Sequence, residues 1–270
     1  MNGSGSLSSS ASVVKVIPIL LYHSVPRDAS DVADRFSVAY EQFATHLDAI
    51  LASGRVPVTI GEIAAGLRGE RQLPDHAVAI TFDDGYDNTL AAIELLCERG
   101  LRASVYVTTG QIGARPMIGR DHLRLLADRP DAVELGAHSV THPRLDELSR
   151  SEVESEVSDS KRQLEQLLGR PVETFAYPYG AYDRRVREAV MAAGFLSAAA
   201  VKNALSHRED DPWAIARWTV CSATGAQQIA RVLDGQGVPC AWRHERLRTR
   251  GYRAVRRLRR TLGRGVGSWR

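Results

Sequence analysis

Between Val13 and about Leu233, short apolar runs alternate with longer amphipathic segments. Short β-branched or apolar runs predict buried strands, and apolar positions spaced three and four apart predict helices. The predicted strands are Val16–Leu21, Val56–Thr59, Ala77–Phe82, Ala103–Val107, Val133–Ala137, Thr174–Tyr177, Phe195–Val201 and Ala214–Val220. The predicted helices are Tyr40–Ala52, Asn88–Arg99, Asp121–Ala127, Arg150–Leu168, Arg184–Ala193 and Ala226–Leu233. This alternation predicts an α/β fold, and seven or eight strands favour a barrel.

The helix predicted over Arg150–Leu168 has the clearest end signals. Ser149 and Glu152 form a capping-box pattern at its start, and Gly169 ends it. No internal repeat and no Gly/Pro-rich linker divides the chain after this helix or before it. We therefore expect one barrel domain over residues 13–235 with a tail on each side.

The two predicted tails differ in composition. Residues 1–12 are rich in Gly and Ser and lack the basic and apolar regions of a signal peptide, which predicts a flexible tail. The chain also has no apolar run of the ~20 residues that cross a bilayer. These features favour a protein that is cytoplasmic or peripheral to the membrane.

The C-terminal tail, residues 236–270, is strongly basic. Its last thirty residues hold eleven arginines and one acidic residue, Glu245, so the net charge of +3 leaves −7 for the rest of the chain. Apolar residues recur at helical intervals over Trp242–Arg260, which suits a basic helix on an anionic membrane surface. Solvated disorder and nonspecific adhesion to nucleic acid are equal alternatives, and no specific nucleic acid is expected.

Two predicted strands end in residues that can carry chemistry. Ala77–Phe82 runs into Asp83 and Asp84, and Val133–Ala137 is followed by His138 and, four residues on, His142. Active sites lie at the carboxyl ends of parallel strands, although two aspartates there can also be a helix cap. If the chain turns helically after the second strand, both imidazoles lie on one side. Carboxylate and imidazole together are a usual ligand set for zinc-like ions.

Hydrolysis at a metal requires three protein ligands and an open position, because the ion must lower the pKa of a bound water to about 7 and polarise a carbonyl. One of the two aspartates is then free to act as general base. A third strand ends in Tyr177, Pro178 and Tyr179, which form either a sugar-stacking wall with backbone N–H groups for an oxyanion, or a simple strand terminator.

Three ordered motifs now identify a resemblance. Thr81–Tyr86 reads T-F-D-D-G-Y, His138–His142 reads H-S-V-T-H, and Phe175–Gly180 reads F-A-Y-P-Y-G. In these motifs the chain resembles the polysaccharide deacetylases, carbohydrate esterase family 4, from Ile17 to about Val220. The resemblance implies a distorted (β/α) barrel of seven or eight strands.

The resemblance also implies roles for individual residues. It makes Asp83 the base and the trio Asp84, His138 and His142 the ligands of a divalent metal. Zinc is the first choice for that metal, with cobalt or nickel acceptable to the same ligands. The turn at Pro178 and Tyr179, through the Tyr179 backbone N–H, helps to hold the oxyanion.

At two positions the chain departs from the family pattern. Where the family often has an arginine that orients the base, this chain has Ala176, and we expect Arg217 on the last predicted strand to pair with Asp83 instead. The late histidine that supplies the general acid is not evident. We expect His23, after the first strand, to act as acid or substrate contact, with a hydrogen-bonded structural histidine as the alternative.

Together these features predict a metal-dependent hydrolase that removes N-acetyl groups from an amino-sugar glycan. The opening I-L-L-Y-H-S-V at Ile19–Val25 resembles a subgroup that includes biofilm poly-N-acetylglucosamine deacetylases. Alternatives are an O-acetyl esterase of the xylan type, or a deformylase or deacetylase of a lipid-linked sugar. Alternatives of another class are a non-catalytic carbohydrate-binding barrel and a nucleic-acid binder driven by the tail.

Overall fold

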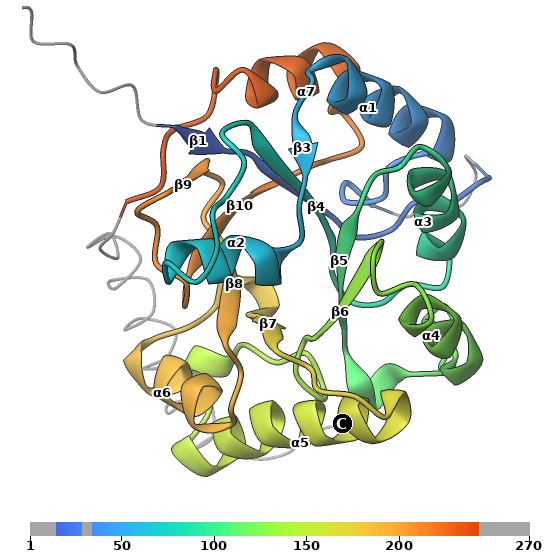
Figure 1. Ribbon diagram of the computed structural model, residues 1–270. Coiled ribbons are helices and arrows are strands. Elements are labelled where there is room, and N and C mark those ends of the chain that lie inside the picture. Colours follow the sequence, from blue (N-terminus) through green and yellow to red (C-terminus); the bar gives the residue numbers. More distant parts are fainter. Residues whose placement is uncertain (1–14, 29–33, 243–270) are drawn as a thin grey trace, which may run out of the picture.

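Seven parallel strands close into a barrel in the computed structural model, which describes residues 15–28 and 34–242 (Figure 1). The strand order is β2-β10-β8-β7-β6-β5-β4, and β4 pairs back onto β2. The barrel strands are β2 (Ile19–Tyr22), β4 (Ala77–Phe82), β5 (Ala103–Val107), β6 (Val133–Ala137), β7 (Thr174–Ala176), β8 (Ser197–Val201) and β10 (Ile215–Thr219). The predicted barrel of seven or eight strands is confirmed.

Three short strands lie at the barrel's margin. β1 (Val16–Ile17) pairs antiparallel with β9 (Ser206–His207), and β3 (Val56–Pro57) extends the pairing of β4. The first predicted strand is divided because Pro18 has no N–H, although its carbonyl still accepts a hydrogen bond from Ala79 N. β4, β5 and β6 match their predicted ranges, and the other predicted strands are shortened at one end or both, although β2 extends one residue further, to Tyr22. β9 was not predicted.

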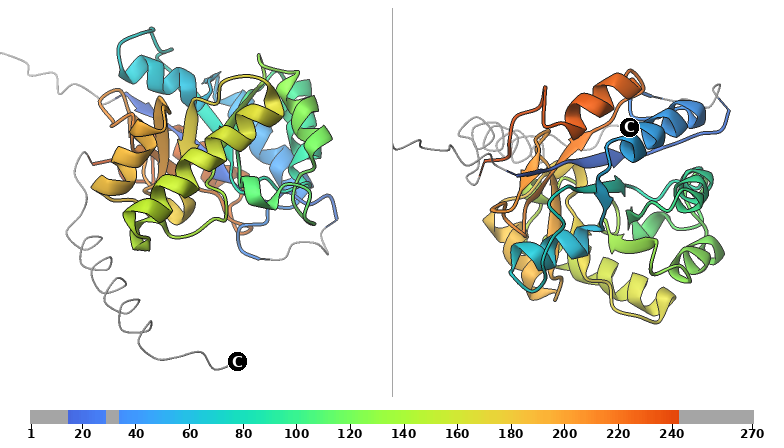
Figure 2. Two further views of the ribbon diagram at one scale, coloured as in Figure 1. Left: turned by 90° about the horizontal axis from the view of Figure 1, so that it is seen from below. Right: turned by 45° about the horizontal axis from the view of Figure 1, so that its top comes forward.

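Helices cover the outside of the barrel and one of its ends (Figures 1 and 2). The six outer helices are α1 (Tyr40–Ala52), α3 (Thr89–Glu98), α4 (Arg120–Ala127), α5 (Arg150–Leu168), α6 (Arg184–Ala192) and α7 (Ala226–Leu233). The longest, α5, begins with the predicted capping box of Ser149 and Glu152 and ends at Gly169 in the left-handed conformation. These six helices match the six predicted ones to within a residue or two at each end.

One helix, α2 (Ile60–Leu67), was not predicted. Thr59, assigned to a strand by its β-branched neighbours, instead caps α2 and forms a capping box with Glu62. The apolar face of α2, with Ile60 and Ile63 buried, packs on Ile19, Tyr106 and other residues of the barrel interior. The helix therefore closes the amino-terminal end of the barrel, and the carboxyl end stays open for the site.

The described chain stays against the barrel beyond α7. Leu205 N donates to Pro239 O, and Ala241 N donates to Leu205 O. No helix within residues 15–28 and 34–242 is long and apolar enough to cross a membrane. The predicted N-terminal tail, residues 1–12, and the arginine-rich segment from residue 243 onward lie outside the described residues.

Candidate active site

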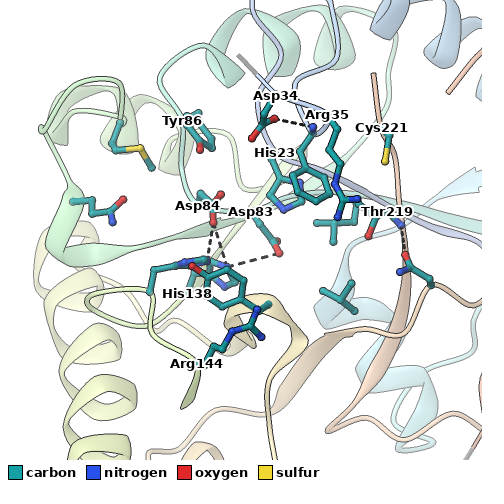
Figure 3. Close-up of a pocket in the computed structure, with 18 residues that line it drawn as sticks. His23, Asp34, Arg35, Asp83, Asp84, Tyr86, His138, Arg144, Thr219 and Cys221 are labelled. Atoms are coloured by element: carbon teal, nitrogen blue, oxygen red, sulfur yellow. Dashed lines mark hydrogen bonds and ion pairs between the residues drawn. The ribbon is translucent and has the colours of Figure 1, made fainter. Parts of the chain in front are cut away.

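The three predicted metal ligands meet at the carboxyl ends of two barrel strands. Asp84 follows β4, and His138 and His142 follow β6, two strands away (Figure 3). Asp84 Oδ1 lies 3.1 Å from His142 Nε2 and 3.5 Å from His138 Nε2. One ligand atom from each residue lies within 4.8 Å of the other two. This spacing would allow all three atoms to reach a single ion.

Several features of the trio fit a cation. Asp84 Oδ1 is buried and has no hydrogen-bond donor among the described residues, although two imidazole nitrogens face it. A neutral imidazole whose other nitrogen carries the proton presents only a lone pair here, so the three atoms need added positive charge between them. Burial lowers the pKa of His138, but Asp83 and Asp84 outweigh burial and raise it, which again indicates a site that attracts positive charge.

A hydrogen bond on its far side sets the orientation of His138. Its Nδ1 lies 2.8 Å from the carbonyl oxygen of Ala176 on β7, and a carbonyl can only accept. The proton therefore sits on Nδ1, and Nε2 keeps the lone pair that a metal requires. The buried ring, 1% exposed, is held in this tautomer by the neighbouring strand.

The segment between the two histidines is a strained turn and not the helical turn that the sequence suggested. Ser139 has φ 64° and His142 φ 60°, a left-handed backbone that costs a non-glycine residue about 1–2 kcal/mol each. Two contacts hold this turn. The Ser139 hydroxyl accepts from His142 N at 3.0 Å, and the Glu156 carboxylate accepts from the backbone of Val140 and Thr141 at 2.8 and 2.9 Å.

Asp84, on the other side of the trio, also has a left-handed backbone, with φ 71°. Gly85, at φ 84°, continues the turn, and its N–H donates to Asp83 O. The tight turn directs two adjacent carboxylates differently: Asp83 toward the barrel interior and Asp84 toward the histidines (Figure 3). Strain of this kind concentrates at functional sites, where the surrounding structure over-determines it.

Arg217 pairs with Asp83 as the sequence suggested. From β10, its guanidinium donates to Asp83 Oδ1 at 2.6 Å and to Oδ2 at 2.7 Å, and both side chains are buried. Burial would raise the pKa of Asp83, but Arg217 and His138 outweigh it and hold the pKa below its usual range. Asp83 is therefore ionised across the neutral range, and one of its oxygens lies 3.8 Å from His138 Nε2.

His23, at the end of β2, lies in the same cavity. Its Nδ1 is buried and has no hydrogen-bond partner among the described residues, and its ring lies 5.0 Å from that of Phe36. Burial lowers the pKa of His23 in spite of the nearby Asp83 and Asp84, so the ring is neutral at pH 7. Among the described residues this nitrogen is unpaired beside the trio, and the role of His23 as acid or substrate contact stays a prediction.

Tyr179 covers the outer side of the histidines. It has φ 57°, its ring centre lies 4.5 Å from that of His142, and its side chain is 55% exposed. The preceding Pro178 is buried and is not among the described residues that line the cavity. The two residues thus differ: Tyr179 faces the solvent-filled space, and Pro178 shapes the turn behind it.

The trio, Asp83, His23 and Tyr179 all line one cavity of ≈ 680 Å³. Its walls also include five residues to which sequence reasoning assigned no role: Asp34, Arg35, Phe36, Tyr86 and Arg144. A second cavity of ≈ 700 Å³ shares six lining residues with the first, among them His23, Asp84 and Tyr86. The two cavities are therefore neighbours on the same side of the barrel. Tyr86 ends the first motif and Arg144 follows the second by two residues, whereas Asp34–Phe36 lie in a loop without any motif.

Comparisons with known proteins give the same result as the motifs. The family model described as polysaccharide deacetylase matches residues 70–198. A Bacillus subtilis protein assigned to the polysaccharide deacetylases, YxkH, is 25% identical over 74% of this chain and 70% of its own length. The poly-β-1,6-N-acetyl-D-glucosamine N-deacetylase of Escherichia coli is 39% identical over 70 residues, which are 25% of this chain and 10% of that protein.

A solved structure has the same fold. The deacetylase PplD of Streptococcus pyogenes, in complex with acetate, superimposes with a TM-score of 0.74 over 82% of this chain and 99% of that one, at 19% identity. The barrel, its strand-end motifs and the matched family agree. Residues 70–198 of this chain, which include both strand ends of the site, therefore belong to a polysaccharide deacetylase domain.

Proposed function

We propose that this domain hydrolyses N-acetyl groups on an amino-sugar glycan, with Asp84, His138 and His142 as ligands of a divalent metal. The observation that carries the proposal is that Asp84 Oδ1 faces the Nε2 atoms of both histidines in an open cavity and has no hydrogen-bond donor among the described residues. Zinc suits one carboxylate and two imidazoles, and cobalt or nickel would suit the same ligands. An ion held there supplies a water of lowered pKa and a Lewis acid for the acetyl carbonyl.

In this proposal Asp83 is the general base. It adjoins a ligand in sequence, lines the cavity and is kept ionised by Arg217. Each carboxylate oxygen accepts one hydrogen bond from Arg217 and retains a second lone pair that can take a proton from an attacking water. Arg217 is a positioning residue: its two parallel bonds fix the plane of the carboxylate.

Three further residues complete the proposed machinery. Amide cleavage expels an amine, which must gain a proton as it leaves. His23 lies in the cavity with an unpaired Nδ1, and it would deliver this proton after its neutral ring has taken one up from solvent. Beside His142, the Tyr179 backbone N–H would help to hold the oxyanion, with Pro178 shaping the turn that presents it.

The substrate is proposed from the relatives. Escherichia coli poly-β-1,6-N-acetyl-D-glucosamine N-deacetylase and Azorhizobium caulinodans chitooligosaccharide deacetylase, whose names specify acetylated amino-sugar polymers, both match this chain in part. Two neighbouring cavities that share lining residues give room for more than one sugar of a chain. We accordingly propose an acetylated amino-sugar glycan as the partner.

The proposed domain limits remain 13–235. The proposed location is cytoplasmic or at the membrane periphery, where the basic tail of residues 241–270 would contact anionic lipid.

The decisive experiment measures acetate release by metal-reconstituted protein from N-acetylglucosamine oligomers and from acetylated xylan. Asp83→Asn and a chelator serve as controls. Release from the oligomers that both controls abolish supports the proposal, and release from xylan alone makes the enzyme an O-acetyl esterase. Failure with both substrates contradicts N-deacetylation of simple glycans.

A further inference from the structure

Two arginine side chains reach the catalytic cavity from opposite walls, and acetyl cleavage has no use for either. Arg35 comes from the loop before α1, and Arg144 comes from the segment after His142. Figure 3 shows Arg35 on the wall beside His23 and Arg144 on the opposite wall below His138. Both arginines therefore line the cavity that holds the proposed metal ligands, where a sugar bound at the site would come close to them.

Each guanidinium rests on an aromatic ring that also lines the cavity. Arg35 Cζ lies 4.5 Å from the centre of the Phe36 ring, and Arg144 Cζ lies 4.4 Å from that of Tyr179. A guanidinium that packs by its face keeps the N–H groups at its edge available. Because the stacking already restricts these side chains, less conformational entropy is lost when they bind a ligand.

Three carboxylates also line the cavity, and one of them, Asp84, belongs to the proposed metal site. Asp83 is paired with Arg217, and Asp34 accepts hydrogen bonds from Phe36 N and from Ser37. Within residues 15–28 and 34–242, no carboxylate forms an ion pair with either of the two stacked arginines. The two exposed guanidinium groups therefore present positive charge to the cavity, although Asp34 and Asp84 also line it.

We propose that Arg35 and Arg144 bind an anionic substituent of the acylated sugar, a phosphate or a carboxylate. The inference rests on the proposed deacetylase function and specifies the substrate class of the same site. Planar guanidinium forks match both anions with two parallel hydrogen bonds, whereas a neutral sugar hydroxyl offers only a single acceptor. A cavity of ≈ 680 Å³ has the size of sites that hold a small ligand bearing such a group.

The first test compares kcat/KM of the metal-reconstituted enzyme for three trisaccharides of N-acetylglucosamine. One is neutral, one carries a phosphate ester, and one carries a lactyl carboxylate. We expect the wild type to prefer one of the anionic substrates by about tenfold or more, the effect of one charge-assisted hydrogen bond. The phosphate and carboxylate arms identify which anion the site takes, and the preference should fall as salt is raised.

Substitutions of the two arginines test whether these residues cause the preference for an anionic substrate. In Arg35→Ala and in Arg144→Ala the ratio of kcat/KM between the anionic and neutral substrates should fall toward one, and Arg144→Lys should retain part of it. The matched control is Arg27→Ala, because Arg27 also stacks on a ring, Tyr40, but does not line the cavity. Equal kcat/KM for the three substrates in the wild type, or variants that lower all three equally, overturns the proposal.

A binding measurement keeps this inference separate from the proposed function. If no substrate releases acetate, the deacetylase proposal fails, and calorimetry with glucosamine and glucosamine 6-phosphate then tests the arginine pair. Chelator is present so that phosphate cannot bind a metal. Tighter binding of the phosphorylated sugar that Arg35→Ala and Arg144→Ala abolish supports the pair as an anion site, and equal binding of both sugars refutes it.

Discussion

Replacing Arg217 by methionine should destabilise the barrel strongly. The guanidinium is fully buried and donates to both oxygens of Asp83 and, at 3.1 Å, to the Thr81 hydroxyl. Removing one partner of a buried pair costs about 3–5 kcal/mol, because the remaining charge has neither water nor a counter-ion. For a domain of this size the melting temperature should fall by on the order of 10 °C.

The assay is urea unfolding in chelator, so that no cation compensates the isolated carboxylate. Asp83→Asn and the double variant with Arg217→Met complete a double-mutant cycle. The double variant should be more stable than Arg217→Met alone, because it leaves no unpaired charge. Arg187→Met is the control: it removes a partly exposed ion pair with Asp211, which should contribute less than about 1 kcal/mol.

Two results would refute this reasoning. A loss below about 1 kcal/mol for Arg217→Met would mean that the pair behaves like a surface ion pair. Strictly additive losses in the cycle would mean that Arg217 and Asp83 do not stabilise each other. Separately, full acetate release by Arg217→Ala would contradict its proposed role in positioning the base.

Three other substitutions test features of the same barrel. Burial raises the pKa of Glu134 to about 7, so its contribution to stability is complete below pH 4.5 and lost as pH rises through 7. In Glu134→Gln the free energy of unfolding, measured in urea, should therefore change less between pH 5 and 8, by up to about 3 kcal/mol. Glu156→Ala should weaken metal binding about 10–100-fold in a chelator competition, with Glu154→Ala on the same helix as an unchanged control. His23→Ala should lower kcat for acetate release about 100-fold or more, and unchanged turnover would remove His23 from the mechanism.

The parts of the site predicted from sequence are those whose geometry is local. Asp83 and Asp84 end a strand whose six residues are all buried, and the histidines follow another strand directly. Once parallel strands are recognised, their carboxyl ends must lie at one edge, so the residues there converge whatever the loops do. The meeting of the three proposed ligands at one end of a barrel could therefore be predicted from this rule together with the motifs.

The features that were not predicted depend on tertiary contacts. The His138–His142 turn is left-handed at two non-glycine residues, and Glu156, which lies 16 and 15 residues from the two N–H groups that it accepts from, holds its backbone. Helix α2 was overlooked because Thr59 has a strand former's side chain, and only the pairing with Glu62 signals its role as a cap. Arg35 and Arg144 reach the cavity through loop paths that no periodicity encodes.

The proposed base, Asp83, is held by a guanidinium that comes from an unexpected strand. The family that the chain resembles often has an arginine at position 176 on β7, and this chain has a small, buried alanine there. Arg217 instead reaches Asp83 from β10, which lies two strands away from β7. Its Cζ lies 5.4 Å from the centre of the Tyr106 ring. Ala176 and Ala199 are small enough to leave room for that ring and the guanidinium inside the barrel. Two parallel hydrogen bonds fix the plane of the carboxylate whichever strand supplies the arginine. The chemistry therefore requires the arginine–carboxylate pair but not one particular sequence position for the arginine.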